Sequence, residues 1–450
     1  MANSYLSSNT GTATNAKKFT YSVWLKRSKI SSEQRFYQGY KDGNNRAYAV
    51  FLSSDKLRVY NMTASNIELY WDSTRVFRDT SAWYHIVLSA DSTQAAQADR
   101  FKVYVNGVEE TDFTKNYNPG QNIDWGNQLA QTNGDLTISG TESQTQLFEG
   151  YMSHAAFVDG TALTPTSFGE TDSTSGIWKF KSPSGVTWGN NGFHLKFENS
   201  GALGTDSSGN SNTFTVNGNL KQGLDTPSNV YATWNILYKN SSTFSNGNTT
   251  SASGSSGEFN SASTLGMSSG KWYMEFKRVS GNYPIFGIVD DIALAEYSNA
   301  NMGLGKTGTT KSIGLRLNDG KTRVNNVVTT QGGSIANGDI VGVAVDKTTN
   351  KIYFSKNGQW SNGSGAWDST TFNASTGATD VSSILTGGTW FFACGTDTGE
   401  ASNTFSANFG NGYFGTTAVS SAGTNASNIG IFEYDVPTGY TALSTKGLNE

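Results

Sequence analysis

The sequence predicts an all-β protein with two tandem antiparallel β-sandwiches. Three features of its composition support this fold class: glycine accounts for 51 of 450 residues, proline for only 6, and aromatic residues reach 12% beside 15% charged residues. A disordered chain would lack the aromatic side chains, because it buries too little apolar surface to offset its conformational entropy. A collagen-like chain would need far more proline. The fold class that fits is one of many short strands joined by polar turns. Because a single sandwich can have about 200 to 250 residues, the length of the chain predicts two domains.

The first half of the chain contains a regular series of strand candidates. Apolar and polar side chains alternate over residues 19–26, which is the period of a strand with one face on a core. Comparable segments follow at 35–40, 47–52, 57–61, 67–71, 83–89, 101–105, 136–139, 150–158 and 193–197. Asn106 and Gly107 follow one of them and are the pair that best tolerates the positive φ angles of a type I′ hairpin turn. We therefore expect one sandwich over residues 19–222.

The second half contains another series. Strands are predicted at 272–276, 285–289, 313–317, 340–345, 352–354, 390–393 and 404–409. Between them and the first series, residues 200–263 are very rich in Ser, Gly, Asn and Thr, so a long loop or linker is expected there. The second sandwich is predicted over 223–415. The polar first residues predict an N-terminal arm over 1–18, and a C-terminal tail is predicted over 416–450.

The first half resembles the laminin-G and pentraxin group of concanavalin-A-like jelly rolls. The resemblance rests on residues 83–88 (WYHIVL), 101–108 (FKVYVNGV), 148–152 (FEGYM) and 159–164 (DGTALT). Residues 195–212 are similar to the opening strands of such a domain, although they come last here. They either complete the first sandwich or start a further one. The first alternative is favoured, because too few strands remain before Trp272 for another core.

The second half resembles a SPRY domain between about residues 225 and 415. Residues 270–276 (GKWYMEF) match its first strand, and residues 338–346 (GDIVGVAVD) with 352–358 (IYFSKNG) match its central hairpin. Residues 405–410 (FSANFG) match its closing strand. Because these patterns occur in the order of the family, the resemblance predicts a SPRY-like sandwich.

Four further segments resemble tail-fibre and appendage proteins of marine bacteriophages. They are residues 191–195 (NGFHL), 206–210 (DSSGN), 225–229 (DTPSN) and 432–440 (FEYDVPTGY). The resemblance implies a virion protein made in the host cytoplasm, and it agrees with an N-terminus that lacks the charged start and apolar core of a signal peptide. Since fibres of this group are commonly trimeric, it also implies a homo-oligomer.

Charge and hydropathy exclude several classes of partner. The net charge is −4 and no polybasic stretch occurs, so no nucleic-acid partner is expected. The sequence has no run of about 18 apolar residues, so membrane insertion is not expected. Cys394 is the only cysteine and lies in an apolar segment, which predicts a buried thiol. The three histidines, His85, His154 and His194, show no ligand spacing and are expected to be structural.

Catalysis is not expected. Concanavalin-like folds also include laminarinase-type glycosidases, whose two Glu and one Asp alternate along one strand so that all three carboxylates face one cleft. The closest matches are Glu433-Tyr434-Asp435, where Pro437 stands in place of the second Glu, and residues 109–112 (EETD), where the spacing differs. Neither reproduces the triad, so the sequence predicts a protein that is not an enzyme.

One loop is a candidate calcium site. Residues 206–212 (DSSGNSN) combine oxygen-bearing side chains with a glycine, and Asp206 and Asn210 are the candidate ligands. The loop lacks the closing Glu of an EF-hand, so a plain polar turn is the alternative. No other cofactor is expected.

Tryptophans beside polar turns are the candidate ligand-binding residues. Trp360 and Trp367 flank a flexible stretch, and Trp71 and Trp125 border other turns. A sugar ring stacks on an aromatic face while neighbouring polar groups bond its hydroxyls. The alternative for each indole is a place in a sandwich core.

These observations predict a non-enzymatic virion surface protein, a tail fibre or capsid appendage, that binds a host surface glycan or protein through its loops. A capsid-decorating or tail-connecting protein that binds other virion proteins is the second interpretation, and a glycan depolymerase is the third. The polar arm over 1–18 is the predicted attachment point to the particle.

Overall fold

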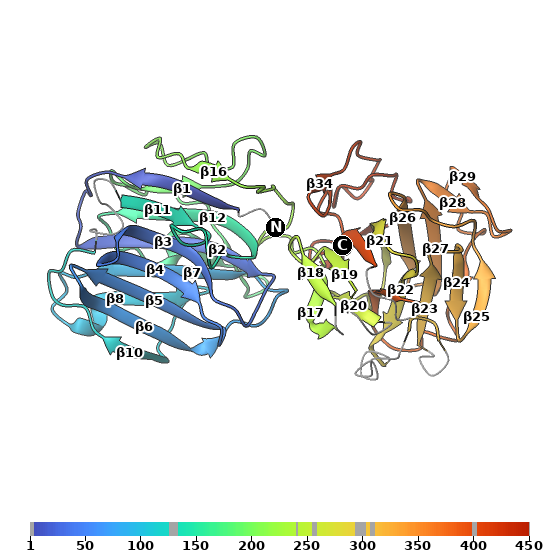
Figure 1. Ribbon diagram of the computed structural model, residues 1–450, viewed down its shortest axis with the longest axis horizontal. Coiled ribbons are helices and arrows are strands. Elements are labelled where there is room, and N and C mark those ends of the chain that lie inside the picture. Colours follow the sequence, from blue (N-terminus) through green and yellow to red (C-terminus); the bar gives the residue numbers. More distant parts are fainter. Residues whose placement is uncertain are drawn as a thin grey trace. The chain divides into compact units, whose positions relative to one another are not determined.

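The computed structural model describes residues 4–125, 134–239, 242–253, 259–292, 303–306, 311–397 and 403–449. Strands dominate these residues, with short 3₁₀ turns η1 (Gln97–Asp99), η2 (Pro165–Ser167) and η3 (Gly447–Asn449). The chain divides into two compact units, residues 1–222 with 226–228 and residues 223–225 with 229–450 (Figure 1). Each unit contains two large sheets, which confirms the predicted all-β class.

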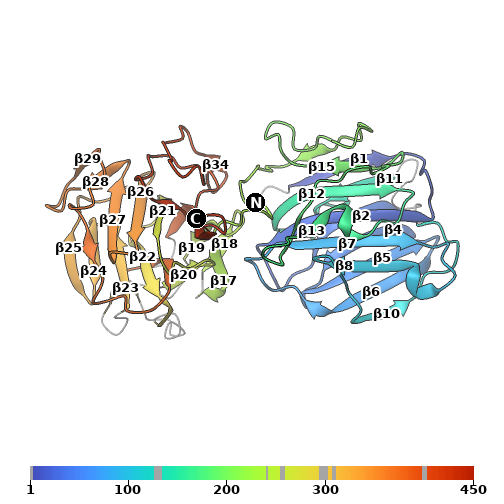
Figure 2. The same cartoon turned by 180° about the vertical axis from the view of Figure 1, so that it is seen from behind.

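The first unit pairs an eight-stranded sheet with a six-stranded sheet (Figure 2). In spatial order, the larger sheet consists of β10 (Phe113–Tyr117), β6 (Asn66–Val76), β5 (Lys56–Thr63), β4 (Asn45–Phe51), β3 (Gln34–Asp42), β11 (Gly134–Ile138), β1 (Tyr5–Thr10) and β16 (Thr215–Asn217). The smaller sheet consists of β15 (Phe193–Leu195), β12 (Gly150–Asp159), β2 (Lys18–Arg27), β7 (Tyr84–Asp91), β8 (Phe101–Val105) and β9 (Val108–Glu109). A separate pair, β13 (Gly169–Thr171) and β14 (Trp178–Phe180), follows β12 in the chain.

The core of the first unit lies between these two sheets. Alternate residues of β2, among them Val23 and Leu25, pack with alternate residues of β4, among them Ala49 and Phe51. Every second side chain of a strand points to the same face, so this pattern places the intervening residues of β4 on the outer face of the larger sheet.

Residues 5–10 belong to this sandwich and do not form a free arm. Strand β1 pairs with β11 on one side and β16 on the other, and Leu6 lies opposite both Ile138 and Val216. Leu6 is buried in the core. The sequence did not predict this strand because most of its side chains are polar. Ladder hydrogen bonds on both sides hold it in place, and it needs only one deeply buried apolar side chain.

Residues 193–212 complete the first sandwich. Strand β15 pairs with β12, with Phe193 opposite Phe157, and Leu195 forms a bridge to Asp206. Phe193 packs in the first core. The favoured one of the two alternatives for this segment therefore holds.

The second unit pairs a seven-stranded sheet with a ten-stranded sheet. The first consists of β17 (Trp234–Lys239), β20 (Phe259–Ser263), β31 (Trp390–Thr396), β22 (Pro284–Asp290), β23 (Ser312–Arg316), β24 (Lys321–Val324) and β25 (Val327–Thr330). The second consists of β18 (Thr243–Ser245), β19 (Thr250–Ala252), β32 (Thr404–Asn408), β21 (Lys271–Ser280), β26 (Ile340–Asp346), β27 (Lys351–Lys356), β28 (Gln359–Ser361) and β29 (Trp367–Ser369), with β30 (Thr379–Asp380) on β27 and β35 (Thr441–Ala442) parallel to β21. A further pair is β33 (Tyr413–Phe414) with β34 (Thr417–Ala418).

The core of the second unit also lies between two sheets. Phe286 of β22 stacks on Phe276 of β21 with ring centroids 4.0 Å apart. Cys394 is buried in the same cluster, and burial raises the pKa of its thiol well above the ordinary value.

The Ser-, Gly-, Asn- and Thr-rich segment 200–263 is not a linker. Its described residues include β16 of the first unit and β17 to β20 of the second. Trp234 supplies core volume, and Ser261 is fully buried while its hydroxyl donates to the Asn235 carbonyl over 2.9 Å. Small hydroxyl side chains suit such tight positions when each finds a backbone acceptor, so a polar composition does not exclude a buried strand.

The C-terminal residues, predicted as a tail, pack on the outer face of the ten-stranded sheet. Phe432 and Tyr440 are buried with Tyr273 of β21, and the ring centroids of Tyr273 and Phe432 are 4.9 Å apart. The buried Glu275 carboxylate accepts the backbone N–H groups of Glu433 and Tyr434, each over 2.8 Å. This part of the chain is thus a cover for the second sandwich.

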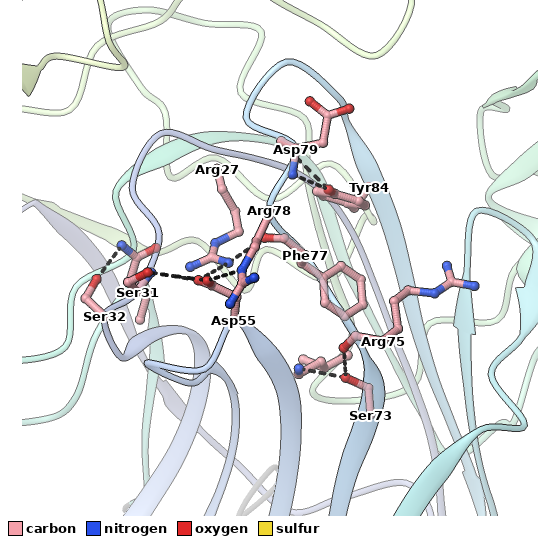
Figure 3. A network of polar contacts seen from close by, with 12 residues as sticks. Arg27, Ser31, Ser32, Asp55, Ser73, Arg75, Phe77, Arg78, Asp79 and Tyr84 are labelled. Carbon is pink, nitrogen blue, oxygen red and sulfur yellow. Dashed lines mark hydrogen bonds and ion pairs between the residues drawn. The ribbon is translucent and has the colours of Figure 1, made fainter. Parts of the chain in front are cut away.

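A buried ion pair fixes one end of the first sandwich (Figure 3). Arg27 and Asp55 have fully buried side chains, and Arg27 Nη1 lies 3.1 Å from Asp55 Oδ1. The same carboxylate accepts Ser31 N–H over 2.7 Å and Arg78 Nε over 2.9 Å (Figure 3). Arg27 also donates to the Phe77 carbonyl over 2.6 Å. One carboxylate therefore joins the end of β2 to the segments that flank β5 and β6.

Candidate functional site

The outer face of the eight-stranded sheet carries a row of tyrosines and arginines, which we call the tyrosine–arginine face. It is formed by residues of β3 to β6 that point away from the core, namely Arg35, Gln38, Tyr40, Arg46, Tyr48, Arg58, Tyr60, Tyr70 and Asp72. The sequence produces this face because each of its strands alternates these residues with core residues such as Ala47, Val59 and Trp71.

Strand register aligns the tyrosines. Gln38 lies opposite Tyr48, Tyr48 opposite Tyr60, and Tyr60 opposite Tyr70. The rings of Tyr48 and Tyr60 are stacked with centroids 4.9 Å apart, and Tyr70 meets Tyr60 edge-on at 6.0 Å. Tyr60 is buried within the row, whereas Tyr48 and Tyr70 are half-buried. The row thus presents two partly open aromatic rings to solvent.

Each tyrosine of the row carries a guanidinium group. Arg35 lies over Tyr48 at 4.0 Å, Arg58 over Tyr70 at 4.3 Å and Arg46 over Tyr60 at 5.9 Å. Such cation–π contacts hold long, flexible side chains in a defined orientation. The two close contacts therefore restrain the side chains of Arg35 and Arg58.

A β-bulge in β3 places Arg35 on this face. The register of β3 against β4 shifts between Arg35 and Tyr37, so that Phe36 and Tyr37 both pack in the core. The extra residue returns both Arg35 and Gln38 to the outer side of the sheet. Alternation alone would have put one of them inside.

A cleft of about 180 Å³ lies at the β3 and β4 end of the face. Its lining comprises Arg35, Tyr40, Arg46, Thr141, Glu142, Ser143, Thr145 and Gln146. Arg35 Nη1 donates to the Gln38 amide oxygen, and Gln38 Nε2 donates to the Glu142 carboxylate. Burial lowers the pKa of Arg35, although Tyr48, Glu142 and Glu33 oppose this. The cleft combines two guanidinium groups, one carboxylate, several hydroxyl groups and the side chain of Tyr40.

Arg58, the third arginine of the face, is already neutralised by a carboxylate. Arg58 Nε and Nη2 donate to the two oxygens of Asp72, each over 2.7 Å. This bidentate pairing raises the pKa of Arg58, the hydrogen bond to Asp72 being the largest cause. The two ends of the face therefore differ in their available charge.

Trp71 and Trp125, predicted as ligand-binding residues, are core residues. Their exposed fractions are 2% and 1%. Trp125 packs between Phe19 and Phe101, with ring centroids 6.1 and 5.9 Å away. Neither indole offers a face to a ligand, because inward-facing strand and loop positions of this sandwich require large apolar volume.

Trp360 and Trp367 lie on neighbouring strands, but they do not form one site. Trp360 is buried with Tyr273 and Phe372 in the cluster under the C-terminal residues. Trp367 packs against the main core of the second unit and donates from Nε1 to the Gly333 carbonyl over 2.7 Å. Because the two indoles join different clusters, they cannot hold one sugar ring between them.

The loop at Asp206 is a hydrogen-bonded turn in this structure. Asp206 Oδ1 accepts the N–H groups of His194 and Ser208 over 2.9 and 2.8 Å, and Oδ2 accepts Asn212 N–H over 2.9 Å. Asn210 points its Nδ2 donor, not its oxygen, at the carbonyls of Gly189 and Gly192. A cation would need these oxygens and carbonyls itself, so the arrangement does not fit calcium. No cluster of three His, Cys, Asp or Glu residues that could hold a metal occurs in the described part of the chain.

The carboxylates weighed for catalysis have structural contacts. Glu433 accepts from Ser420, Asp435 accepts from Thr424, and Glu110 pairs with Arg75 at 3.0 Å. Glu275 has a pKa raised to about 7, mainly by burial, but it holds two backbone N–H groups and lies outside the cleft. No described carboxylate lines the cleft besides Glu142.

Two of the histidines meet in space. His154 Nδ1 and His194 Nε2 are 3.3 Å apart, and the His154 ring stacks on Phe180 at 3.6 Å. Burial lowers the pKa of His154 to about 3 and that of His194 to about 4, so both rings are neutral at physiological pH. His85 lies between Trp24 and Trp178 and is likewise structural.

The tyrosine–arginine face was missed at the level of sequence, although a signal for it existed. Three successive strand candidates carry Ala-Tyr at 47–48, Arg-Val-Tyr at 58–60 and Tyr-Trp at 70–71, and Arg46 and Asp72 lie directly beside the first and the third. The alternation marks these residues as outward, but only the register shows that the tyrosines are adjacent.

Comparisons with known proteins agree with this fold. Residues 1–167 match the laminin-G model of the concanavalin A-like lectin/glucanases superfamily. No curated protein sequence matches the chain. In the described residues, no helix is long and apolar enough to cross a membrane.

Similar solved structures share low sequence identity with the chain. The SPRY domain of human HERC1 is 14% identical with a TM-score of 0.28, covering 39% of this chain and 96% of that one. Domain 4 of an arabinanase from Geobacillus stearothermophilus, in complex with arabinotriose, is 21% identical with a TM-score of 0.25, covering 33% of this chain and 64% of that one. A pentraxin from Limulus polyphemus is 14% identical with a TM-score of 0.28, covering 48% of this chain and 95% of that one. By the family model alone, residues 1–167 are similar to the concanavalin A-like lectin and glucanase superfamily.

Proposed function

We propose that the protein is a non-enzymatic surface protein whose first sandwich binds a glycan or a protein through the tyrosine–arginine face. The observation that carries this proposal is the aligned row of Tyr48, Tyr60 and Tyr70, with a guanidinium group over each ring and a polar cleft beside it. Half-buried aromatic rings with fixed polar neighbours suit sugar rings, which need an apolar surface and hydrogen bonds together. The concanavalin-like model match over residues 1–167 agrees with a binding role.

The proposed setting is the outside of a bacteriophage particle, as a tail fibre or capsid appendage that attaches to the host. The similarity of four sequence segments to marine phage appendages supports this setting. Other virion proteins and a host surface glycan or protein are then the partners, and a homo-oligomer is the assembly.

Purified protein applied to a glycan array and to host cells tests the binding function. We expect Tyr48→Ala and Tyr70→Ala to weaken binding, because each removes a partly open ring. Tyr104→Ala is the matched control, since Tyr104 is also a half-buried tyrosine but lies on the other sheet. Equal losses in all three variants, or no binding by the wild type, would contradict the proposal.

A structural role in the particle is the second candidate, and the edge strand β25 favours it. All four residues of β25 are exposed, including Val327 at 69% and Val328 at 44%, and the strand ends its sheet among the described residues. An exposed, apolar strand edge is a template for pairing with another chain. Locating the protein in intact particles by electron cryomicroscopy distinguishes the two roles, because a free first sandwich favours host binding and a fully packed one favours a scaffold.

A further inference from the structure

The cleft beside the tyrosine–arginine face has two arginines, Arg35 and Arg46, for which the described residues provide no ion pair with a carboxylate. Within the described part of the chain, neither Arg35 nor Arg46 lies within ion-pair distance of an acidic group, whereas Arg58 on the same face is paired twice with Asp72. Glu142 and Glu33 affect Arg35 only at longer range. Among the described residues, the face therefore holds one guanidinium group that is paired with a carboxylate and two that are not.

The hydrogen bonds at the cleft also provide Arg35 and Arg46 with no direct carboxylate partner among the described residues. The one close partner of Arg35 is the neutral amide of Gln38, which in turn engages the Glu142 carboxylate. The Nε atoms of Arg35 and Arg46 are buried and have no hydrogen-bond partner. These two atoms are closed to solvent, so a ligand in the cleft would have to meet the terminal Nη groups of the two arginines.

The geometry suits a planar anion. Arg35 lies over the Tyr48 ring at 4.0 Å, which orients its guanidinium group before any ligand arrives, whereas Arg46 is 5.9 Å from the Tyr60 centroid, at the outer limit of such a contact. A guanidinium group held in this way presents its edge, which matches the two oxygens of a carboxylate. Pre-orientation reduces the entropy lost on binding.

The other residues that line the cleft suit a sugar, and the size of the cleft suits a small ligand. Thr141, Ser143, Thr145 and Tyr40 contribute hydroxyl groups, which match the hydroxyls of a pyranose ring. The volume of about 180 Å³ equals that of about six waters of liquid, which is room for a single sugar unit.

We propose that this cleft binds an acidic sugar residue, whose anionic group is held by Arg35 and Arg46 while the rest of the chain lies along the tyrosine row. The inference rests on the proposed glycan-binding function and names the class of glycan. A carboxylate and a sulfate ester share the required negative charge, and the test below separates them.

The test measures the affinity of the full-length protein for three oligosaccharide probes by isothermal titration calorimetry. The probes are oligogalacturonate, the same oligomer with its carboxyl groups reduced to alcohols, and a sulfated oligomer of equal length. We expect an acidic probe to bind about 10- to 100-fold more tightly than the reduced one, the range of a charge-assisted hydrogen-bonded contact. Added salt should weaken only the acidic probes. The acidic probe that binds more tightly identifies the anionic group.

Variants locate the effect at the cleft. Arg46→Gln should remove the preference for the acidic probe without changing affinity for the reduced one, and Glu142→Gln should increase that preference. Arg75→Gln is the control, because Arg75 is paired with Glu110 and is not part of the tyrosine–arginine face. The comparison of probes on the wild type needs no variant, so a variant that fails to fold does not block the test.

The possible failures are distinguishable. Equal binding of acidic and reduced probes would overturn the acidic-sugar proposal and leave glycan binding intact. Binding of none of the probes would overturn the acidic-sugar proposal, and a glycan array that is also blank would overturn the glycan-binding function itself. A preference that survives both Arg46→Gln and Arg35→Gln would refute this cleft as the site.

Discussion

Replacing Asp55 by Asn should destabilise the first sandwich far more than the loss of an ordinary surface ion pair. Asp55 lies at φ 64°, a left-handed conformation that Asn tolerates and most residues do not. The substitution therefore keeps the backbone and removes only the charge. Arg27 remains fully buried beside it, with Nε and Nη2 already lacking partners.

The expected cost follows from burial. Breaking a buried ion pair by removing one partner typically costs 3 to 5 kcal/mol, because the other charge stays buried without compensation. The Asn side-chain oxygen can still accept the Ser31 N–H group, so we expect the lower end, about 3 kcal/mol. For a unit of this length that is a fall in Tm of about 6 to 12 °C.

Arg78→Gln is the matched control. Arg78 contacts the same carboxylate, but its side chain is 56% exposed, so its loss should cost at most about 1 kcal/mol. Arg27→Met combined with Asp55→Asn should recover part of the stability, because an apolar side chain over Phe51 needs no counter-charge.

Differential scanning calorimetry checks these values. The two units should give separate transitions, so the transition that does not move is an internal standard. Asp55→Asn should also reduce the loss of stability in acid. Burial opposes ionisation of Asp55, but Ser31, Arg78 and Arg27 outweigh it and hold the pKa of Asp55 below its ordinary value. The ion pair therefore stabilises the first unit at pH values above the ordinary pKa of Asp, and this stabilisation is lost as the pH falls through the lowered pKa. A cost equal to that of Arg78→Gln would refute the reasoning.

Three further predictions concern other parts of the chain. Burial raises the pKa of Glu275 to about 7 in the folded state, so the second unit should lose up to about 3 kcal/mol of stability as pH rises from about 4.5 to 7, and Glu275→Gln should flatten that slope in urea titrations at several pH values. Leu6→Ala should cost about 2 to 5 kcal/mol in the first unit by chemical denaturation, and deletion of residues 1–18 should unfold that unit, whereas a free arm would leave its stability unchanged. Asp206→Ala should lower the Tm of the first unit, and calcium or a chelator should leave the wild-type Tm unchanged; a rise in Tm with calcium would revive the metal site.

Much of the fold followed from period-two patterning, and the failures have one cause. Strands with clear alternation, such as β2 and β26, were found because one face must be apolar. The polar side chains of residues 1–18 and 200–263 predict an arm and a linker, although these segments contain strands such as β1 and β19. Their strands are held by pairing to neighbours that come from distant parts of the chain, and composition does not show pairing.

The candidate site shows the same division. Composition made aromatic residues the natural binding candidates, and tryptophan the first choice. The largest side chains instead fill the cores, as Trp71 and Trp125 show. The aromatic residues at the surface are half-buried tyrosines, whose hydroxyl groups can face water.

The sequence by itself determined that this chain is all-β, that it has two cores, and which residues alternate toward them, because side-chain direction along a strand is a local property. Only the tertiary structure decided that Tyr48, Tyr60 and Tyr70 form one row and that a bulge turns Arg35 outward beside them. It also decided that the Asp206 carboxylate accepts the backbone N–H groups of a turn. These are matters of register and of contact between distant segments, and they depend on pairings that no local pattern specifies.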